Sequence, residues 1–214
     1  MKTDELVAML AANAAPVRRH AARRQWAAAL LAGVLLGLVV MQLVFGARRD
    51  LMQVMGWPMF WVRLLVPLCI AAGAYLAVER LARPGARVGG GGLALLVVPV
   101  LFIWLLAAIV LASAPAGSRP ALLMGQTWRT CTANIALVAL PVFACAMIAL
   151  KGLAPTRPAH AGAAAGALAG AVGAAIYALH CQEFEAPFLA IWYVLGISLP
   201  AALGALVGAR LLRW

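Results

Sequence analysis

The sequence predicts an all-α membrane protein, a bundle of six transmembrane helices with both termini in the cytoplasm. Hydrophobic residues occupy 66% of the 214 positions and charged residues only 11%, so one soluble core cannot bury the apolar surface. Six apolar stretches also approach the roughly 20 residues that a helix needs to cross the hydrocarbon region of a bilayer. The Lys and Arg residues lie mainly at the ends of these stretches, which is the distribution that sets membrane topology.

The six spans are expected near residues 25–45, 60–78, 93–113, 131–150, 161–180 and 187–209. Their orientation follows from the loops, because cytoplasmic loops carry an excess of Lys and Arg. One side collects twelve such residues, whereas the other has four, namely Arg48, Arg49, Arg119 and Arg129. The twelve-residue side is therefore predicted to be cytoplasmic. Arg63 lies just inside the second span, and we expect its side chain to extend to the membrane interface.

Residues 1–24 form the predicted cytoplasmic tail, and residues 25–214 form the transmembrane domain. Asp4 and Glu5 favour the start of a helix, because acidic side chains stabilise its positive end. Leu6, Met9 and Leu10 follow at helical spacing and form its apolar face. A helix of about a dozen residues is marginal alone in water. The tail therefore needs a partner, either another protein or the lipid headgroups.

The predicted tail helix is followed by Pro16, which ends a helix, and by a basic collar of Arg18, Arg19, His20, Arg23 and Arg24. The positive charge indicates a membrane surface and not nucleic acid, because no polar domain carries a basic patch.

Glycines recur at four-residue intervals in three of the spans. Small residues at this spacing let two helix backbones approach closely. Tight packing within the bundle and a dimer face are both compatible with the pattern, so the sequence leaves the oligomeric state open. The glycines concerned are Gly33, Gly37, Gly162, Gly166, Gly170, Gly204 and Gly208.

Catalytic motifs are missing from the sequence. It has no Cys-x-x-Cys pair, no glycine-rich phosphate loop and no paired metal-binding histidines on one helix. We therefore predict that the protein is not an enzyme and holds no resident cofactor. The alternative class is a membrane thiol oxidoreductase or a small exporter. Prolines interrupt several spans, but the buried acids and amides of a translocation path do not accompany them.

The polar turn at residues 179–187 is the densest cluster of reactive groups in the chain. Cys181 lies in this turn at the end of the fifth span, beside His180 and Glu183, and Cys131 opens the fourth span. The short inner loop between these spans makes them antiparallel neighbours, so the two thiols can meet on the outer side. Cys69 and Cys145 fall in the middle of spans, where we expect them to be small buried hydrophobes.

Three interpretations of the outer cysteines stay open: a structural disulfide, a reversible sensor of oxidant or metal, and two unpaired thiols. Cys131, Cys181 and His180 together offer ligands to a transient thiophilic metal ion. Arg129, two residues before Cys131, is positioned to lower the pKa of a thiol.

Several short motifs resemble those of the NrsF family. They are the opening Met-Lys-Thr-Asp-Glu-Leu, Pro16 with the following Val, Thr-Cys-Thr-Ala-Asn around Cys131, and His-Cys-Gln-Glu-Phe-Glu-Ala-Pro-Phe around Cys181. The resemblance implies a bacterial inner-membrane anti-sigma factor that binds an extracytoplasmic-function sigma factor. It further implies that residues 1–24 hold the sigma factor and that Cys131 and Cys181 sense stress. Asp4, Glu5, Leu6, Met9 and Leu10 are then the candidate partner-binding residues.

Overall fold

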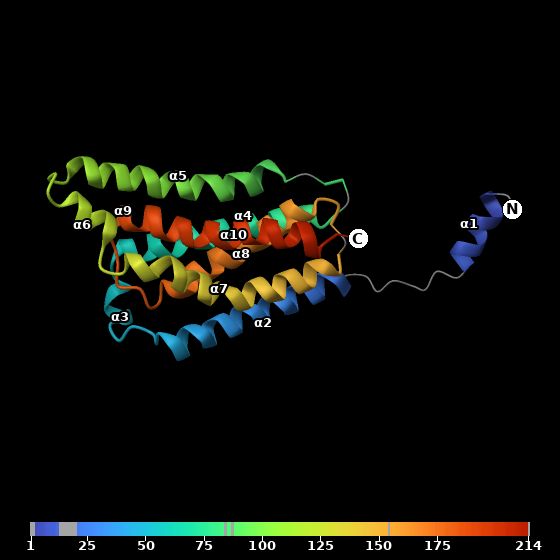
Figure 1. Cartoon of the computed structure of the whole chain (residues 1–214), viewed down its shortest axis with the longest axis horizontal. Helices are drawn as coiled ribbons and strands as arrows, with labels where there is room; N and C mark the ends of the chain where they lie inside the picture. The colour runs from blue at the N-terminus through green and yellow to red at the C-terminus, as the bar shows by residue number, and fades with distance from the viewer. Residues whose placement is uncertain (1–2, 13–20, 84, 87, 154, 214) are drawn as a thin grey trace.

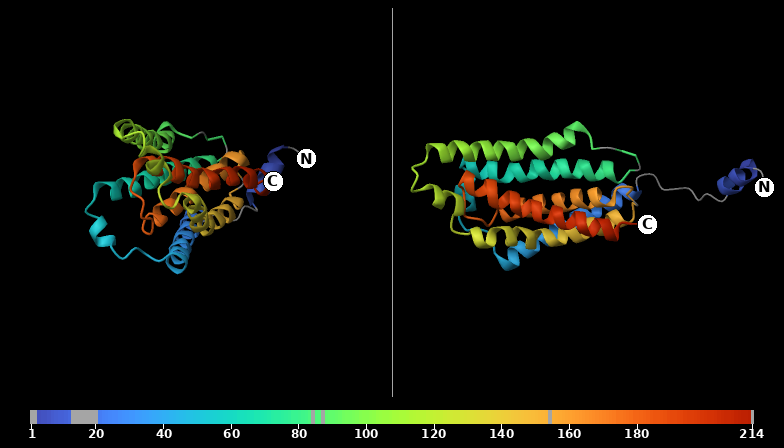
Figure 2. Two further views of the ribbon diagram at one scale, coloured as in Figure 1. Left: turned by 60° about the vertical axis from the view of Figure 1, so that its left-hand side comes forward. Right: turned by 45° about the horizontal axis from the view of Figure 1, so that its top comes forward.

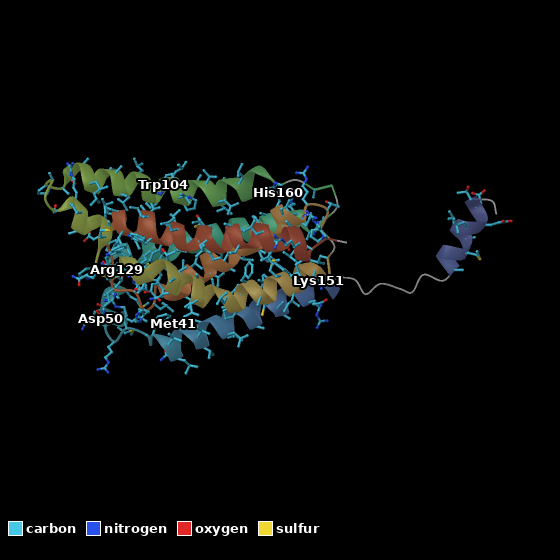
Figure 3. All side chains as sticks on the ribbon, viewed as in Figure 1. Met41, Asp50, Trp104, Arg129, Lys151 and His160 are labelled. Carbon is cyan, nitrogen blue, oxygen red and sulfur yellow. The ribbon has the colours of Figure 1, made fainter. Side chains whose placement is uncertain are left out.

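The computed structural model contains helices and no strands in the residues that it describes, which are 3–12, 21–83, 85–86, 88–153 and 155–213. Six helices are long and apolar enough to cross a membrane, as predicted. The N-terminal end of α2 (Ala21–Val44) and the C-terminal end of α10 (Val194–Leu211) lie at the same end of the bundle (Figure 1). Lys151 and His160 lie at that end, whereas Asp50 and Arg129 lie at the opposite end (Figure 3).

The remaining long helices are α4 (Pro58–Leu81), α5 (Gly90–Ser113), α7 (Trp128–Lys151) and α8 (Pro158–Tyr177). Four shorter elements join them at the Asp50 end: α3 (Leu51–Val54), α6 (Arg119–Met124), α9 (Ala186–Phe188) and the π-helical turn η1 (Leu189–Tyr193). The sixth predicted span is therefore composed of α9, η1 and α10. The fifth ends at Tyr177, three residues earlier than expected, because the chain leaves the helix to form the polar turn.

Helix α8 is the centre of the bundle. Within its apolar window 72% of the residues are buried, against 17% for α2 and for α5. Figure 2 shows α5 along one edge of the bundle, beside α4. Helices that lie on different sides of the polar turn therefore all pack against α8.

Close glycine contacts hold α8 against its neighbours, which confirms the prediction of tight packing within the bundle. A Cβ atom on Gly166 would overlap the carbonyl oxygen of Pro200 in α10, and one on Gly162 would overlap that of Gly204. On α2, a Cβ on Gly33 would lie 2.8 Å from the Cα of Val142 in α7. Larger side chains at these positions would push the helices apart.

The N-terminal helix α1 (Thr3–Ala12) exists as predicted and stands apart from the bundle (Figure 1). Asp4, Glu5, Leu6 and Met9 are all exposed. The predicted helix end at Pro16, together with Arg18, Arg19 and His20, lies outside the described residues.

Cys69 and Cys145 are partly exposed on the bundle surface. The expectation that both are buried is therefore wrong. Their helices α4 and α7 each present one face to neighbouring helices and another to the outside, where lipid replaces protein as the apolar surroundings.

Candidate functional site: a buried dithiol in a clamped turn

Cys131 and Cys181 lie side by side at the Asp50 end of the bundle. Both are free thiols and both are buried, with exposed fractions of 0% and 2%. Cys131 belongs to the first turn of α7, and Cys181 lies in the turn of residues 178–185 that follows α8. The two sulfur atoms are close enough to share a hydrogen bond. The predicted meeting of the two thiols is therefore what the fold produces.

Arg63 of α4 holds the turn in place through hydrogen bonds to its carbonyl oxygens. One of its terminal nitrogens donates hydrogen bonds to the carbonyl oxygens of Cys181 and Glu183, at 2.7 and 2.8 Å, and the other donates to that of Ala178 at 2.7 Å. Its guanidinium carbon lies 4.4 Å from the centroid of the Phe184 ring. Only 1% of Arg63 is exposed. The expectation that Arg63 extends to the membrane interface is wrong, because the orphan carbonyls at the end of α8 bind its charge inside the protein.

Glu183 joins the turn to the start of α7. Its carboxylate accepts hydrogen bonds from the backbone N–H groups of Gln126 and Thr127, at 2.7 and 3.1 Å. These groups precede the first residue of α7, where a negative charge is stabilised by unpaired N–H groups and by the helix dipole. Gly125 makes the approach possible, because it has a φ of +53° and a Cβ there would lie 2.7 Å from a Glu183 oxygen. Glu183 thus fixes the two cysteine-bearing segments relative to each other.

The loop that follows α2 contacts the same turn from a third side. The Arg48 guanidinium donates to the carbonyl oxygen of Cys181 at 3.1 Å and forms a two-pronged ion pair with Asp50 at 2.7 Å. The hydrogen bond to Arg48 lowers the pKa of Asp50, which favours the charged carboxylate. The Arg48 backbone N–H also donates to the Leu179 carbonyl at 3.3 Å. The loop that follows α2 is therefore hydrogen-bonded directly to the cysteine turn.

His180 also packs against the α2 loop. Its Nδ1 lies 2.8 Å from the Gly46 carbonyl oxygen, and its ring packs at a tilt against those of Phe45 and Tyr177. Within the described part of the chain, no group of three or more His, Cys, Asp or Glu side chains gathers closely enough to hold a metal ion. The metal site predicted at Cys131, Cys181 and His180 stays a prediction.

Cys181 is the more acidic of the two thiols. The hydrogen bond with Cys131 lowers the pKa of Cys181 below that of an ordinary thiol, and burial opposes this shift. The Glu183 backbone N–H, the nearby Tyr193 hydroxyl and the charge of Arg63 lower it further. The sequence indicated Arg129 for this role, but Arg129 is exposed and stacks on Trp128. The nearby cation is Arg63, which lies 118 residues from Cys181 in sequence, so spacing alone could not reveal it.

These features define a class of protein: a polytopic helical membrane protein with a buried dithiol at one end and an exposed helix beyond the other. The sequence matches the family described as "NrsF: Negative regulator of sigma F" over residues 10–214. The chain therefore belongs to the NrsF family, which is regulatory and not enzymatic.

Two full-length relatives are similar to this chain. The "Probable anti-sigma-F factor NrsF" of Azospira oryzae is 45% identical over 214 residues, and the alignment covers both chains completely. The "Anti-sigma-F factor NrsF" of Caulobacter vibrioides is 41% identical over an alignment of 229 positions, again covering both chains completely. No solved structure matches the chain.

Proposed function

We propose that this protein is an anti-sigma factor of the bacterial inner membrane. Its cytoplasmic N-terminal segment holds an extracytoplasmic-function sigma factor and releases it when an oxidant or a thiophilic metal modifies Cys131 and Cys181. The observation that carries this proposal is the buried dithiol in a turn to which Arg48, in the loop that follows α2, is hydrogen-bonded. The names of the two full-length relatives support the sigma-factor partner.

Helix α2 supplies the connection between the two ends of the bundle. Its 24 residues correspond to roughly 36 Å of helix. Its C-terminal end leads into the loop on the cysteine turn, and its N-terminal end leads back toward the tail. Close packing of Gly33 and Gly37 on α7 joins α2 to the helix that carries Cys131. A change at the dithiol that moves the α2 loop thus has a physical route to the tail.

Helix α1 provides the partner-binding surface in this proposal. Leu6 and Met9 expose 41% and 54% of their surface, and Asp4 and Glu5 lie in the first turn. Leu10 completes the predicted contact set. An apolar stripe flanked by acidic residues fits the groove of a partner protein, because burial of the stripe compensates for ordering the segment.

The release step is tested by replacing cysteines in the full-length protein. Transcription from the sigma factor's own promoters is measured after exposure to an oxidant or a thiophilic metal salt. Cys131→Ser and Cys181→Ser are expected to abolish induction, whereas the control Cys69→Ser responds as the wild type does. Normal induction in both outer-cysteine variants would refute the sensing role.

The sequestration step is tested separately by co-purifying the sigma factor with the membrane protein in detergent. Deletion of residues 1–24 is expected to abolish recovery of the sigma factor while the transmembrane domain is still inserted. Equal recovery with and without the tail would refute its role.

A further inference from the structure

A groove runs along the surface of the bundle between α7 and α10. Its wider part has a volume of about 420 Å³ and lies at the start of both helices. A narrower part of about 60 Å³ continues it further along the same two helices. The lining repeats every four residues on each helix, so the two parts form one stripe. Its repeating members are Thr132, Ala136 and Leu140 on α7, and Leu195, Leu199 and Leu203 on α10.

The packing of α10 against α8 keeps this groove open. The glycines of α8 bring its backbone into direct contact with that of α10 at Pro200 and Gly204. Helix α10 therefore follows α8, while α7 presents the small side chain of Ala136 to the gap. Between 43% and 47% of the surface of the three α10 leucines stays exposed. In a pair of membrane-spanning helices, such an apolar groove is open to lipid acyl chains.

Two tryptophans form the mouth of the groove. The ring centroids of Trp128 and Trp192 lie 5.5 Å apart, and both residues are half-buried. The indole N–H of Trp192 donates to the Leu123 carbonyl oxygen at 2.9 Å, and the Thr132 hydroxyl donates to the Trp192 carbonyl oxygen at 3.3 Å. Tryptophan at the end of a membrane span is typical of the level where headgroups meet acyl chains. The mouth is therefore expected at headgroup level.

Arg129 supplies a positive charge at this mouth. Its guanidinium carbon lies 5.2 Å from the centroid of the Trp128 ring, and the residue is exposed. No carboxylate pairs with it within the described part of the chain, where Arg48 and Asp50 form the one ion pair. No acidic residue lines the groove either. A free guanidinium above an apolar groove matches a phosphate group followed by acyl chains.

The length of the groove matches one leaflet of a bilayer. Arg129 and Leu140 are eleven residues apart, which corresponds to roughly 17 Å of helix. Half of the hydrocarbon core of a bilayer is about 15 Å thick. Arg129 lies at one end of the bundle and Lys151, the last residue of α7, at the other (Figure 3). The groove therefore runs from headgroup level to about the middle of the bilayer.

We propose that the groove between α7 and α10 binds one phospholipid with a net negative headgroup, from the leaflet on the side of the cysteine turn. Arg129 binds the phosphate, and an acyl chain lies along the leucines of α10. A zwitterionic lipid binds more weakly, because its ammonium group finds no acidic partner in the lining. The site is separate from the dithiol, since neither Cys131 nor Cys181 lines the groove.

The headgroup preference is tested by native mass spectrometry of the full-length protein in mild detergent, with phosphatidylglycerol or phosphatidylcholine added. The wild type is expected to retain one phosphatidylglycerol and to bind it at least tenfold more tightly than phosphatidylcholine. Arg129→Gln should bind phosphatidylglycerol about tenfold more weakly, because it loses a charged hydrogen bond to the phosphate. Arg49→Gln, at another exposed arginine, is the matched control and should bind as the wild type does. Equal retention by the wild type and Arg129→Gln would overturn the site.

The acyl-chain part of the groove is tested with Ala136→Phe, which fills the stripe with an aromatic ring. Binding of phosphatidylglycerol is expected to fall at least tenfold. Ala133→Phe is the matched control, because Ala133 is exposed on the same helix and lines neither part of the groove. The thermal unfolding temperature shows whether both variants are folded. Equal binding by the two variants would refute the groove as the acyl-chain site.

The same spectra detect a second copy of the chain as the other occupant of the groove. A lipid-free dimer that Ala136→Phe dissociates would overturn the proposal. These assays contain no sigma factor and no oxidant. Failure to bind phosphatidylglycerol would therefore refute the lipid site and leave the proposed function unaffected.

Discussion

The cysteine turn and the N-terminal helix differ in how they are held. Residues 178–185 accept hydrogen bonds from Arg63 of α4 and from Arg48 of the loop after α2. The Glu183 carboxylate also joins this turn to the start of α7. Helix α1 stands apart from the bundle with exposed apolar side chains (Figure 1). A sensing site has to be rigid if modification of its thiols is to move the neighbouring helices. A binding segment needs an open surface, and its partner supplies the remaining contacts.

The largest effect is expected at Arg63. Arg63→Ala removes the donor from the carbonyl oxygens of Ala178 and Glu183, leaves Arg48 as the donor to that of Cys181, and opens a buried space. We therefore expect the free energy of unfolding to fall by about 3–5 kcal/mol. Thermal unfolding in detergent measures the change. The exposed residue Arg49 provides the control Arg49→Ala, which should shift stability by less than about 0.5 kcal/mol. Equal effects of the two variants would show that the turn does not depend on Arg63.

A smaller loss is expected at Gly125. Gly125→Ala places a Cβ 2.7 Å from both Glu183 and Phe188 and strains a residue with a φ of +53°. We expect a cost of about 1–3 kcal/mol, measured by the same unfolding experiment. Gly117→Ala is the matched control, since a Cβ at Gly117 meets nothing within 4 Å. A loss at Gly117 as large as that at Gly125 would contradict this explanation.

The carboxylate of Glu183 is expected to contribute less. Glu183→Gln keeps an oxygen that accepts hydrogen bonds from the start of α7 but removes the charge, so the expected loss is about 1 kcal/mol. The neighbouring Glu185 is exposed, and Glu185→Gln should leave the unfolding transition unchanged. If the two variants unfold alike, the charge at the start of α7 is not what holds the turn.

The six spans could be predicted from the sequence because each is a local property of about 20 residues. The approach of Cys131 to Cys181 could also be predicted, since a short loop makes their helices antiparallel neighbours. The role of Arg63 could not be predicted from the sequence. Its side chain turns inward because α8 ends at Tyr177 and leaves unpaired carbonyl groups, among them that of Ala178, to which Arg63 of α4 donates. Such a contact depends on the packing of two helices and leaves no spacing pattern.

Glu183 was recognised as part of the site for a different reason from the one the structure gives. The sequence indicated a supporting group beside Cys181. In the fold its carboxylate caps a helix 56 residues earlier in the chain, which a local motif does not encode. The prediction for Arg129 failed for the converse reason: Arg129 is close to Cys131 in sequence, but the fold does not bring its charge to the thiols.

The smallest effect on stability, and the largest on partner binding, is expected in α1. Leu6→Asp with Met9→Asp should change the unfolding free energy of the transmembrane domain by less than about 0.5 kcal/mol, because both side chains are already exposed. Recovery of the sigma factor with the full-length protein should nevertheless fall at least tenfold, since two apolar contacts are replaced by charges. Asp4→Asn is the milder companion, expected to weaken binding only slightly because a charge at the edge of an interface contributes little. If the double variant lowered stability as Arg63→Ala does, α1 would be a packed element of the bundle, and the division between a rigid sensing site and an open binding segment would fail.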